Sequence, residues 1–400
     1  MIDAQIKKQL FTAIDAGLPG VIRIRRAIHA NPELSGREYA TARRIYSFLR
    51  DLGLSPRYYV RRTGVVVQIH NGEGPTVALR ADTDALPIEE KNRVSFRSRR
   101  RGVMHACGHD MHTAALLGAV QALLAVKHLW SGTVAAIFQP SEEQEPGGAL
   151  SMIREGAFPH KTDAVFGLHV SSEHATGQVG IKAGEECSGE LVFDVLVKGR
   201  GGHGSAPHTT IDPIVCAASM IMDLQTLISR ECPAVQPAVL TVGSLHAGTK
   251  NNVIPDEAVF SGTIRTFSAK LQRFLRRRVG QCLKTTARSF RAGVDVTFRD
   301  SYPSGFNNPA LAKRAQSALA VLLGKRNVIT RPYPIMFSED FVYYQKKTPG
   351  LYMHLGVRPK GVRTMPGIHS ATFLPDEKAL RTAILVHTGC VLEMLGKMGG

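Results

Sequence analysis

The chain has 400 residues, of which 44% are hydrophobic and 21% charged, and these proportions indicate a folded globular protein rather than a disordered one. No apolar run approaches the roughly 20 residues that a membrane span needs, and the N-terminus lacks the apolar segment of a signal peptide. The net charge of +17 is compatible with nucleic acid, an anionic membrane surface or an acidic substrate. Neither a zinc finger nor the basic-aromatic pattern of an RNA-binding sheet is found, so a nucleic-acid-associated role is a remote alternative.

The six cysteines are dispersed along the chain, at positions 107, 187, 216, 232, 282 and 390. In a chain of this length such spacing predicts reduced thiols and a cytoplasmic protein rather than a disulfide framework. The length predicts two or three domains, at roughly 150 residues each.

The first part of the chain predicts helices that give way to strands. Residues 1–52 show apolar positions at helical spacing, interrupted at residues 31–33. Short β-rich runs follow at Val65–Ile69 and Thr76–Leu79, and the second leads into Asp82 and Asp84. Open α/β sheets bind ligands beyond the carboxyl ends of their strands, so these two carboxylates are candidate active-site residues.

The next loop contains the densest cluster of metal-binding side chains. Cys107 and His109 are separated by one glycine, so both side chains can point to one face of a tight turn. An apolar run at residues 114–124 predicts a buried helix directly behind them. Thiolate and imidazole are strong ligands for divalent transition metals, so the segment predicts a metal site. Taken by itself, the segment could instead hold one cysteine of a disulfide among scattered surface histidines.

Two further strands end in side chains of the same kind. The predicted strand Thr133–Phe138 is followed by Glu142 and Glu143, and the predicted strand Ala164–Leu168 ends on His169. Strands that alternate with helices predict an α/β fold with a doubly wound, mainly parallel sheet. His369 lies in the last long loop, before a closing helix at 376–396.

The middle of the chain predicts a separate unit. From residue 187 to 298 the expected order is strand, helix, two strands, helix and strand, which is a ferredoxin-like α+β arrangement. Asp212 and Pro213 are placed to begin its first helix. We therefore expect a catalytic domain made of residues 1–186 and 299–400, with an inserted domain at 187–298.

Five side chains are candidate metal ligands: Cys107, His109, Glu143, His169 and His369. Five ligands exceed what one tetrahedral zinc takes, and two divalent ions sharing a bridging ligand fit better. Glu142 is then free to act as the general base on water. Asp84 is expected to orient a ligand or the base. Zn, Co or Ni suit thiolate and imidazole, and Mn is a further candidate.

At these residues the sequence resembles the metal-dependent amidohydrolases, in the branch of hippurate hydrolases, N-acyl-amino-acid deacylases and plant auxin–amino-acid conjugate hydrolases. The matching motifs run in order along almost the whole chain: Arg26–Ser35, Arg80–Pro87, Met104–Asp110, Phe138–Glu143, Gly167–His169, Gly201–His208, Asn252–Ala258, Gly262–Arg265, Ser338–Phe341 and His369–Ser370. The resemblance implies hydrolysis of the amide bond of an N-acyl amino acid, with a dipeptidase or carboxypeptidase as the alternative within this class. A non-catalytic binding protein on the same scaffold is a remote alternative, which an intact base and ligand set disfavours.

The resemblance also implies roles for individual residues. Cys107 would bridge the two metals, His203 would support the oxyanion, and Asn252 would help to hold substrate. The inserted domain would be a lid through which the chain forms a homodimer or a higher homo-oligomer. For Arg265, a substrate carboxylate competes with an ordinary internal ion pair, and His208 is either a substrate contact or a structural histidine.

Departures from the usual pattern are few and remove no ligand. Thr83, Met111, Ser141 and Ala371 replace residues that are usual there, and the loop Arg93–Arg101 is more basic than usual. Fixed positive charge near the pocket would favour anionic substrates, and a solvated loop without effect on catalysis is the alternative. His29 is expected to be a surface or packing residue.

Overall fold

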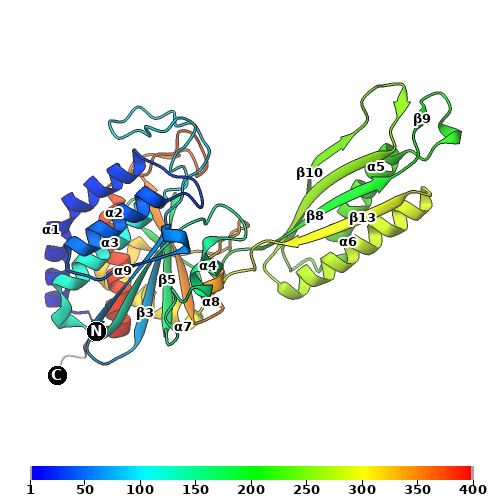
Figure 1. Ribbon diagram of the computed structural model, residues 1–400. Coiled ribbons are helices and arrows are strands. Elements are labelled where there is room, and N and C mark those ends of the chain that lie inside the picture. Colours follow the sequence, from blue (N-terminus) through cyan, green and yellow to red (C-terminus); the bar gives the residue numbers. More distant parts are fainter. Residues whose placement is uncertain (1, 398–400) are drawn as a thin grey trace. The chain divides into compact units, whose positions relative to one another are not determined.

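A computed structural model describes residues 2–397 of the chain. The chain forms two compact units (Figure 1). Unit 1 contains the described residues up to Gly184, Phe306–Tyr333 and the described residues from Asp340 onward, and unit 2 contains Glu185–Gly305 and Pro334–Glu339. Unit 2 thus extends beyond the predicted range 187–298. Residues Pro334–Glu339 belong to it because Ile335 bonds to the start of unit 2 through its backbone: Ser188 N donates to Ile335 O at 3.1 Å, and Ile335 N donates to Glu186 O at 2.8 Å.

Unit 1 is built on an eight-stranded mixed sheet in the order β1-β2-β4-β3-β5-β16-β6-β15. Its strands are β1 (Arg57–Tyr59), β2 (Gly64–Asn71), β3 (Thr76–Asp82), β4 (Gly132–Gln139), β5 (Ala164–Ala175), β6 (Val179–Ile181), β15 (Val328–Thr330) and β16 (Gly350–Arg358). The four central strands, β4, β3, β5 and β16, are parallel to their neighbours in that group. Their residues are buried almost continuously, as expected for strands that are covered on both faces.

Helices cover both faces of this sheet. One face carries α1 (Ala4–His29), α2 (Tyr39–Asp51), α3 (His109–Ala125), α7 (Pro309–Leu323) and α9 (Ala379–Leu395), whose apolar side chains join one large core. The other face carries α4 (Gly148–Arg154) and α8 (Val342–Gln345) over a second core. Helix α3 is apolar all round because it is packed between α1 and α9, which lie beside it in Figure 1. The predicted doubly wound, mainly parallel sheet is confirmed.

The predicted chemistry stands at one edge of this sheet. Asp82 ends β3, His169 lies within β5, and the loop that carries Glu142 follows β4. The three strands are parallel, so their carboxyl ends meet at the same edge. Three short 3₁₀ turns complete the elements of this unit: η1 (Val60–Arg62), η2 (Lys127–Leu129) and η5 (Lys325–Asn327).

Unit 2 is a four-stranded antiparallel sheet in the order β10-β12-β8-β13. Its elements are β8 (Gly189–Lys198), β9 (Gly202–His203), η3 (Pro207–Thr209), α5 (Pro213–Thr226), η4 (Leu227–Glu231), β10 (Ala238–Ala247), β11 (Val253–Ile254), β12 (Glu257–Thr266), α6 (Ala269–Ser289) and β13 (Gly293–Asp300). The order of its main elements, β8-α5-β10-β12-α6-β13, is the predicted ferredoxin-like one. Helices α5 and α6 pack on the sheet to form its core.

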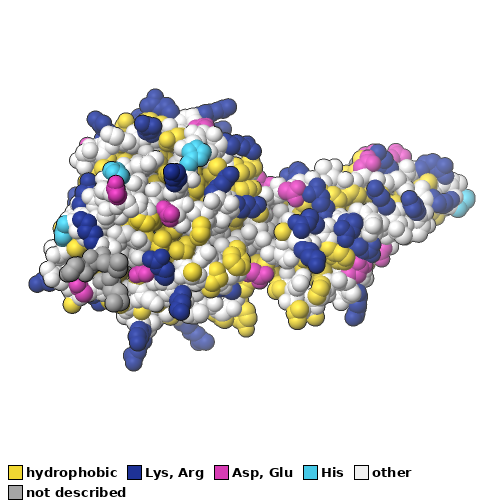
Figure 2. Space-filling model, turned by 90° about the horizontal axis from the view of Figure 1, so that it is seen from below, with side chains coloured by type: hydrophobic (Ala, Val, Ile, Leu, Met, Phe, Trp, Pro, Cys, Tyr) yellow, Lys and Arg dark blue, Asp and Glu magenta, His cyan; other side chains and the backbone are white. Residues whose placement is uncertain are grey.

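Side chains at the N-terminal ends of α5 and α7 cap these helices. Asp212 caps α5 as predicted, its side chain accepting from the backbone N–H groups of Ile214 and Val215. Asn308 caps α7, its side chain accepting from the backbone N–H groups of Ala310 and Leu311. The two-residue strands β7 (Gly184–Glu185) and β14 (Phe306–Asn307) stand where the chain leaves and re-enters unit 1. Among the described residues no helix has the length and apolarity to cross a bilayer. Basic side chains are spread over both units on the face shown in Figure 2.

Candidate active site

Unit 1 brings all five predicted metal ligands together. Their donor atoms form two triads in which every donor lies within 4.8 Å of the others: Cys107, His109 and His169 form one, and Cys107, Glu143 and His369 form the other. The two triads share the thiol of Cys107. This is the arrangement that two ions with one bridging ligand require.

The turn at Gly108 aims Cys107 and His109 at this point. Gly108 has a left-handed backbone with φ of +85° and stands at the N-terminus of α3. A Cβ at this position would lie 2.6 Å from Cγ2 of Val170, so only glycine fits. Cys107 and His109 therefore flank a bend that is packed against Val170 in β5, next to His169.

Hydrogen bonds fix the two buried imidazoles in the same tautomer. Nδ1 of His109 lies 3.2 Å from Oδ1 of Asp84, and Nδ1 of His169 lies 2.8 Å from the carbonyl oxygen of Val170. Because each Nδ1 faces an acceptor, it keeps its proton, and Nε2 is the nitrogen through which each ring would bind a metal. Nε2 of His169 is 3.3 Å from Sγ of Cys107, and Nε2 of His109 is buried without a hydrogen-bond partner among the described residues.

Glu143 and His369 complete the second triad on its open side. Nε2 of His369 lies 3.1 Å from Oε1 of Glu143, and the histidine side chain is half exposed. His369 has a left-handed backbone with φ of +63°, and its N–H donates to the carbonyl of Ala106, one residue before Cys107. A strained non-glycine residue at such a position is typical of a functional site.

Glu142 lies beside the triads and belongs to neither. A carboxylate oxygen of Glu142 lies within 4.8 Å of donor atoms of both His109 and Glu143, and the residue is 7% exposed. His109, Glu142 and Glu143 are thus a further group of close donors, and a buried carboxylate beside the two triads is placed to exchange a proton with a water there.

The two aspartates after β3 support the cluster in different ways. Asp84 accepts hydrogen bonds from Ser35 Oγ at 2.7 Å and from Glu143 N at 3.0 Å, besides its contact with His109. Asp82 lies 2.5 Å from Nδ1 of His112. Nε2 of His112 accepts from Val170 N at 2.9 Å, so both ring nitrogens of His112 are used and none is left for a metal.

The pKa shifts in the cluster reflect closely spaced acidic groups that a bound cation would stabilise. Burial and the carboxylates of Glu143 and Glu142 raise the pKa of the Cys107 thiol well above its usual range. Burial alone would lower the pKa of His109, but Asp82 and Asp84 raise it to about 10. Divalent ions would supply the positive charge that this set of acidic groups lacks, and would deprotonate the thiol. The donor set thus fits two divalent metals.

An ion-pair network that the sequence did not reveal lies under α3. Oδ2 of Asp110 accepts from Arg25 Nε at 2.7 Å and lies 3.0 Å from His29 Nδ1. The other nitrogen of His29 lies 3.1 Å from Glu90 Oε1. The prediction for His29 was wrong, since it is a fully buried, ion-paired residue rather than a surface or packing one. Its partners lie 61 and 81 residues away, which no local pattern can reveal.

The predicted lid residues lie together in unit 2. His203 pairs with Val253 across the short ladder of β9 and β11, and Gly204 N donates to the carbonyl of Asn252 at 2.9 Å. The backbone N–H of Ser205 donates to Nδ1 of His203 at 3.1 Å. The proton of a neutral His203 ring is therefore on the exposed Nε2.

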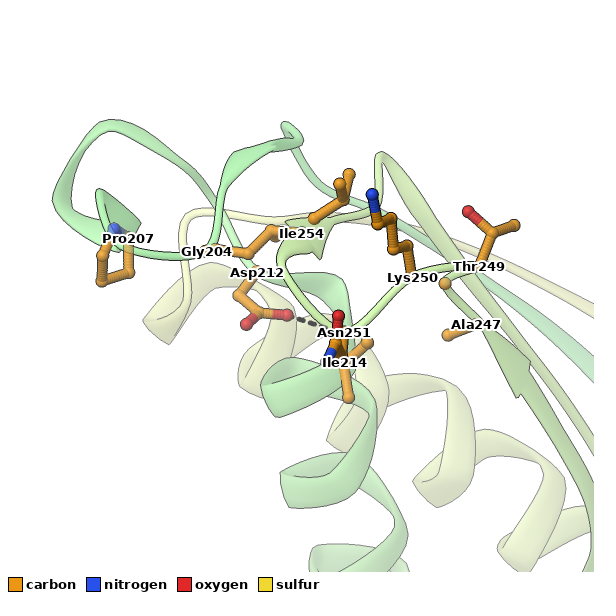
Figure 3. A pocket seen from close by; sticks show the side chains of 11 residues that line it. Gly204, Pro207, Asp212, Ile214, Ala247, Thr249, Lys250, Asn251 and Ile254 are labelled. Atoms are coloured by element: carbon orange, nitrogen blue, oxygen red, sulfur yellow. Dashed lines mark hydrogen bonds between the residues drawn. The ribbon is translucent and has the colours of Figure 1, made fainter.

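An open pocket of about 530 Å³ adjoins these residues (Figure 3). It is lined by Gly204, by Asp212 and Ile214 at the start of α5, and by the loop from Ala247 to Asn251. Figure 3 shows Lys250 and Thr249 projecting from this loop, while Asp212 is engaged in capping α5. His208 lies in η3 and is exposed.

Arg265 and the basic loop have contacts of their own. The guanidinium of Arg265 pairs with Glu190 at 2.7 Å and donates to the carbonyl of Met336, as in the internal ion-pair alternative. The arginines of the loop Arg93–Arg101 are all exposed. Arg97 lies 3.4 Å from Glu89 and Arg100 lies 3.6 Å from Glu33.

Comparison with known proteins gives a family and an activity class. The sequence profile described as Peptidase family M20/M25/M40 matches residues 78–393. The thermostable carboxypeptidase 2 of Saccharolobus solfataricus is 38% identical over 381 residues, which cover 94% of this chain and 96% of the relative. The N-acetyl-L-cysteine deacetylase of Bacillus subtilis is 39% identical over 337 residues, covering 84% of this chain and 80% of the relative.

A solved structure agrees with these relatives. The Bacillus subtilis protein YXEP, described as a dinuclear metal-binding peptidase of the M20 family, superimposes with a TM-score of 0.83 at 30% sequence identity. The match covers 95% of this chain and 99% of that protein. From the profile match, the two relatives and this structure, we conclude that the chain belongs to Peptidase family M20/M25/M40 and is a hydrolytic enzyme that acts on amides.

Proposed function

We propose that this enzyme hydrolyses the amide bond of N-acyl amino acids with two divalent metal ions at the Cys107 cluster. One observation carries the proposal: two ligand triads share Cys107, and the buried carboxylate of Glu142 lies beside them without belonging to either. The N-acetyl-L-cysteine deacetylase relative supports the substrate class, because it is named for removing an acyl group from an amino acid.

Each residue of the site has a separate task in this proposal. Cys107, His109, Glu143, His169 and His369 would hold the metals. When bound, such ions would polarise the substrate carbonyl and make a water molecule more acidic. Glu142 takes the proton of the attacking water and passes it to the nitrogen of the leaving amine as the C–N bond breaks. Asp84 keeps His109 in the tautomer that presents Nε2.

His203 supplies a hydrogen-bond donor from unit 2. Its Nδ1 already accepts from Ser205, so the Nε2–H group is free to donate to the oxygen that becomes negative in the tetrahedral intermediate. Asn252 lies beside it and is exposed, and we assign it to substrate binding together with His208. Unit 2 would act as a lid. Because Arg265 is held by Glu190, it would reach a substrate carboxylate only after that ion pair opens.

Unit 2 would also be the dimerisation domain. Strand β10 is an edge strand of ten residues, and Val239 and Leu245 on it are exposed. The neighbouring α5 exposes Val215 and Met222. Long edge strands with apolar side chains tend to pair with another chain. We propose a homodimer, which light scattering of the purified protein would test.

A dipeptidase or carboxypeptidase is the second candidate. The 38% identical relative from Saccharolobus solfataricus is named a carboxypeptidase, and peptide and N-acyl bonds are both amides next to an amino-acid carboxylate. The same metal cluster and the same base would serve either substrate, so the distinction depends on the group on the acyl side of the amide bond.

A free cysteine at each of the six positions supports a reducing, cytoplasmic compartment for the enzyme.

A single screen tests the proposal. The purified enzyme, loaded in turn with Mn, Zn, Co or Ni, would be assayed on hippurate, N-acetyl and long-chain N-acyl amino acids and on dipeptides. We expect turnover of N-acyl amino acids to exceed that of dipeptides. Including N-acyl aspartate and glutamate tests whether the basic loop Arg93–Arg101 favours anionic substrates, a preference that should weaken as salt is raised. Higher kcat/KM on dipeptides with every metal would make the enzyme a peptidase.

A further inference from the structure

Glu38 occupies a position for which a glutamate is a poor choice. It is the N-cap residue of α2, where serine, threonine, aspartate and asparagine are preferred. Its side chain makes no capping bond to the helix. That task falls to Glu33, whose carboxylate accepts from the backbone N–H groups of Thr41 at 2.8 Å and Ala40 at 3.2 Å. The carboxyl group of Glu38 is therefore free for another partner.

That partner is the turn that carries the two active-site glutamates. Oε1 of Glu38 accepts from the backbone N–H of Ser141 at 2.8 Å and lies 3.4 Å from its hydroxyl. Ser141 directly precedes Glu142 and has a left-handed backbone with φ of +57°, an uncommon conformation for a non-glycine residue. A buried hydrogen bond from its N–H helps to hold that conformation.

A second carboxyl group holds the other end of the same turn. Asp84 accepts from the backbone N–H of Glu143 at 3.0 Å. Glu142, the proposed base, is thus the residue between two backbone groups that are each bound by a buried carboxyl. Ser35, three residues before Glu38, donates a hydrogen bond to Asp84. The short segment before α2 therefore contributes to both of the carboxyl groups that bind this turn. The position of the Glu142 side chain depends on the backbone of this turn.

Glu38 binds the turn as a neutral group. The residue is fully buried, and Oε2 has no hydrogen-bond partner among the residues that the structure describes. Burial and the nearby charge of Asp84 raise the pKa of Glu38 to about 8. The raised pKa favours the protonated form, and a glutamine amide presents the same acceptor oxygen to the backbone N–H of Ser141.

We propose that Glu38 is a positioning residue for catalysis, which holds Ser141 so that Glu142 and Glu143 keep their places at the metal cluster. The expected loss of kcat rests on the proposed function. The expected loss of metal affinity does not, because it can be measured without a substrate. Loss of a residue that orients a ligand from behind typically costs 10- to 100-fold in metal affinity or activity.

The test compares Glu38→Ala, Glu38→Asp and Glu38→Gln with a matched control, Glu33→Ala, which removes the cap of the same helix without touching Ser141. The full-length enzyme would be measured for kcat and KM on the best N-acyl amino acid, for the Kd of Zn or Mn by equilibrium dialysis, and for Tm. We expect Glu38→Ala and Glu38→Asp to lower kcat or weaken metal binding by roughly 10- to 100-fold. Glu38→Gln should stay within about threefold of wild type, because it keeps the acceptor for Ser141 N. Glu33→Ala should lower Tm with kcat and Kd close to wild type.

Three outcomes would overturn the inference: wild-type kcat and metal affinity in Glu38→Ala, equal losses in Glu33→Ala, or a Glu38→Gln variant as impaired as Glu38→Ala. The aspartate variant keeps an acid at this position but withdraws it from Ser141, so the test stands even where the alanine variant does not fold. If the wild-type enzyme hydrolyses no N-acyl amino acid, the proposed function fails, and the metal Kd values still decide the role of Glu38.

Discussion

Asp84 contacts the candidate ligand His109, with Oδ1 of the carboxylate 3.2 Å from Nδ1 of the ring. This contact decides which ring nitrogen carries the proton. Nε2 is therefore the nitrogen through which His109 would bind a metal, and it lies where the donor atoms of Cys107 and His169 gather. The same carboxylate binds the backbone of Glu143, so one residue orients a ligand from each triad.

Asp84→Asn should therefore impair both triads. The asparagine amide would present N–H donors either to His109 or to the N–H of Glu143, and one of the three hydrogen bonds to this side chain would be lost. We expect metal affinity or kcat to fall by roughly 10- to 100-fold. Ser35→Ala, which removes only one donor to Asp84, is the control and should cost much less. Equal losses in the two variants, measured by dialysis and kinetics, would show that Asp84 does not orient the ligands.

Cys107→Ala tests whether the two triads share a ligand. Because Cys107 is the only member common to both, its removal should weaken both sites at once. Metal analysis should approach two divalent ions per chain for the wild type and fall by at least one for the variant. Cys187→Ala, which removes a buried thiol in unit 2, is the control. Unchanged metal content in Cys107→Ala would exclude this thiol from the ligand set.

The buried pair of His29 and Asp110 should make stability depend on pH. Both ring nitrogens of His29 face carboxylates, and although burial lowers its pKa, Asp110 and Glu90 together raise it above the ordinary value of 6.5. A raised pKa gives stability that is fully present below pH 6.5 and is lost as the pH rises through the folded-state value.

The variant His29→Gln should accordingly be less stable than wild type by roughly 3–5 kcal/mol at pH 6, the usual cost of breaking a buried ion pair. The difference should shrink as the pH rises. Denaturant unfolding of both proteins from pH 6 to pH 9 measures it. A difference that is constant or grows with pH would mean that the ring is neutral in the folded enzyme.

His203→Ala tests the contribution of unit 2. Loss of one donor to a developing oxyanion typically costs 10²–10³ in kcat, and we expect that loss with metal content and Tm unchanged. Ser205→Ala removes the hydroxyl that lies 2.7 Å from Nδ1 but keeps the backbone N–H that donates to it, so its effect should be much smaller than that of His203→Ala. A loss of activity that is fully explained by lost metal or by unfolding would remove His203 from the reaction.

The sequence predicted the parts of this enzyme that depend on local pattern. The helix behind Cys107 and His109 and the strands that lead to Asp82 and His169 were found because buried strands and buried helices leave continuous apolar signals in the chain. The five candidate ligands stand out because Cys, His and Glu recur at strand ends, and the structure brings them within reach of two ions.

The supporting residues could not be predicted in this way. Glu38 lies 103 residues before its partner Ser141, and His29 lies 81 residues before Asp110. No neighbouring residue in the sequence indicates either contact, because Glu38 meets the turn after β4, and His29 meets the first turn of α3, only in the folded chain. A glutamate at an N-cap position was the one local sign that Glu38 has a task outside its own helix.

Glu142→Gln is the most direct test of the catalytic account. The substitution keeps the size of the side chain and leaves both triads intact, but it removes the group that accepts a proton. We expect the variant to retain two divalent ions and substrate binding while kcat on an N-acyl amino acid falls by roughly 10²–10⁴, the range for general acid–base catalysis. Near-normal turnover with both metals bound would contradict the account and assign the base to another residue.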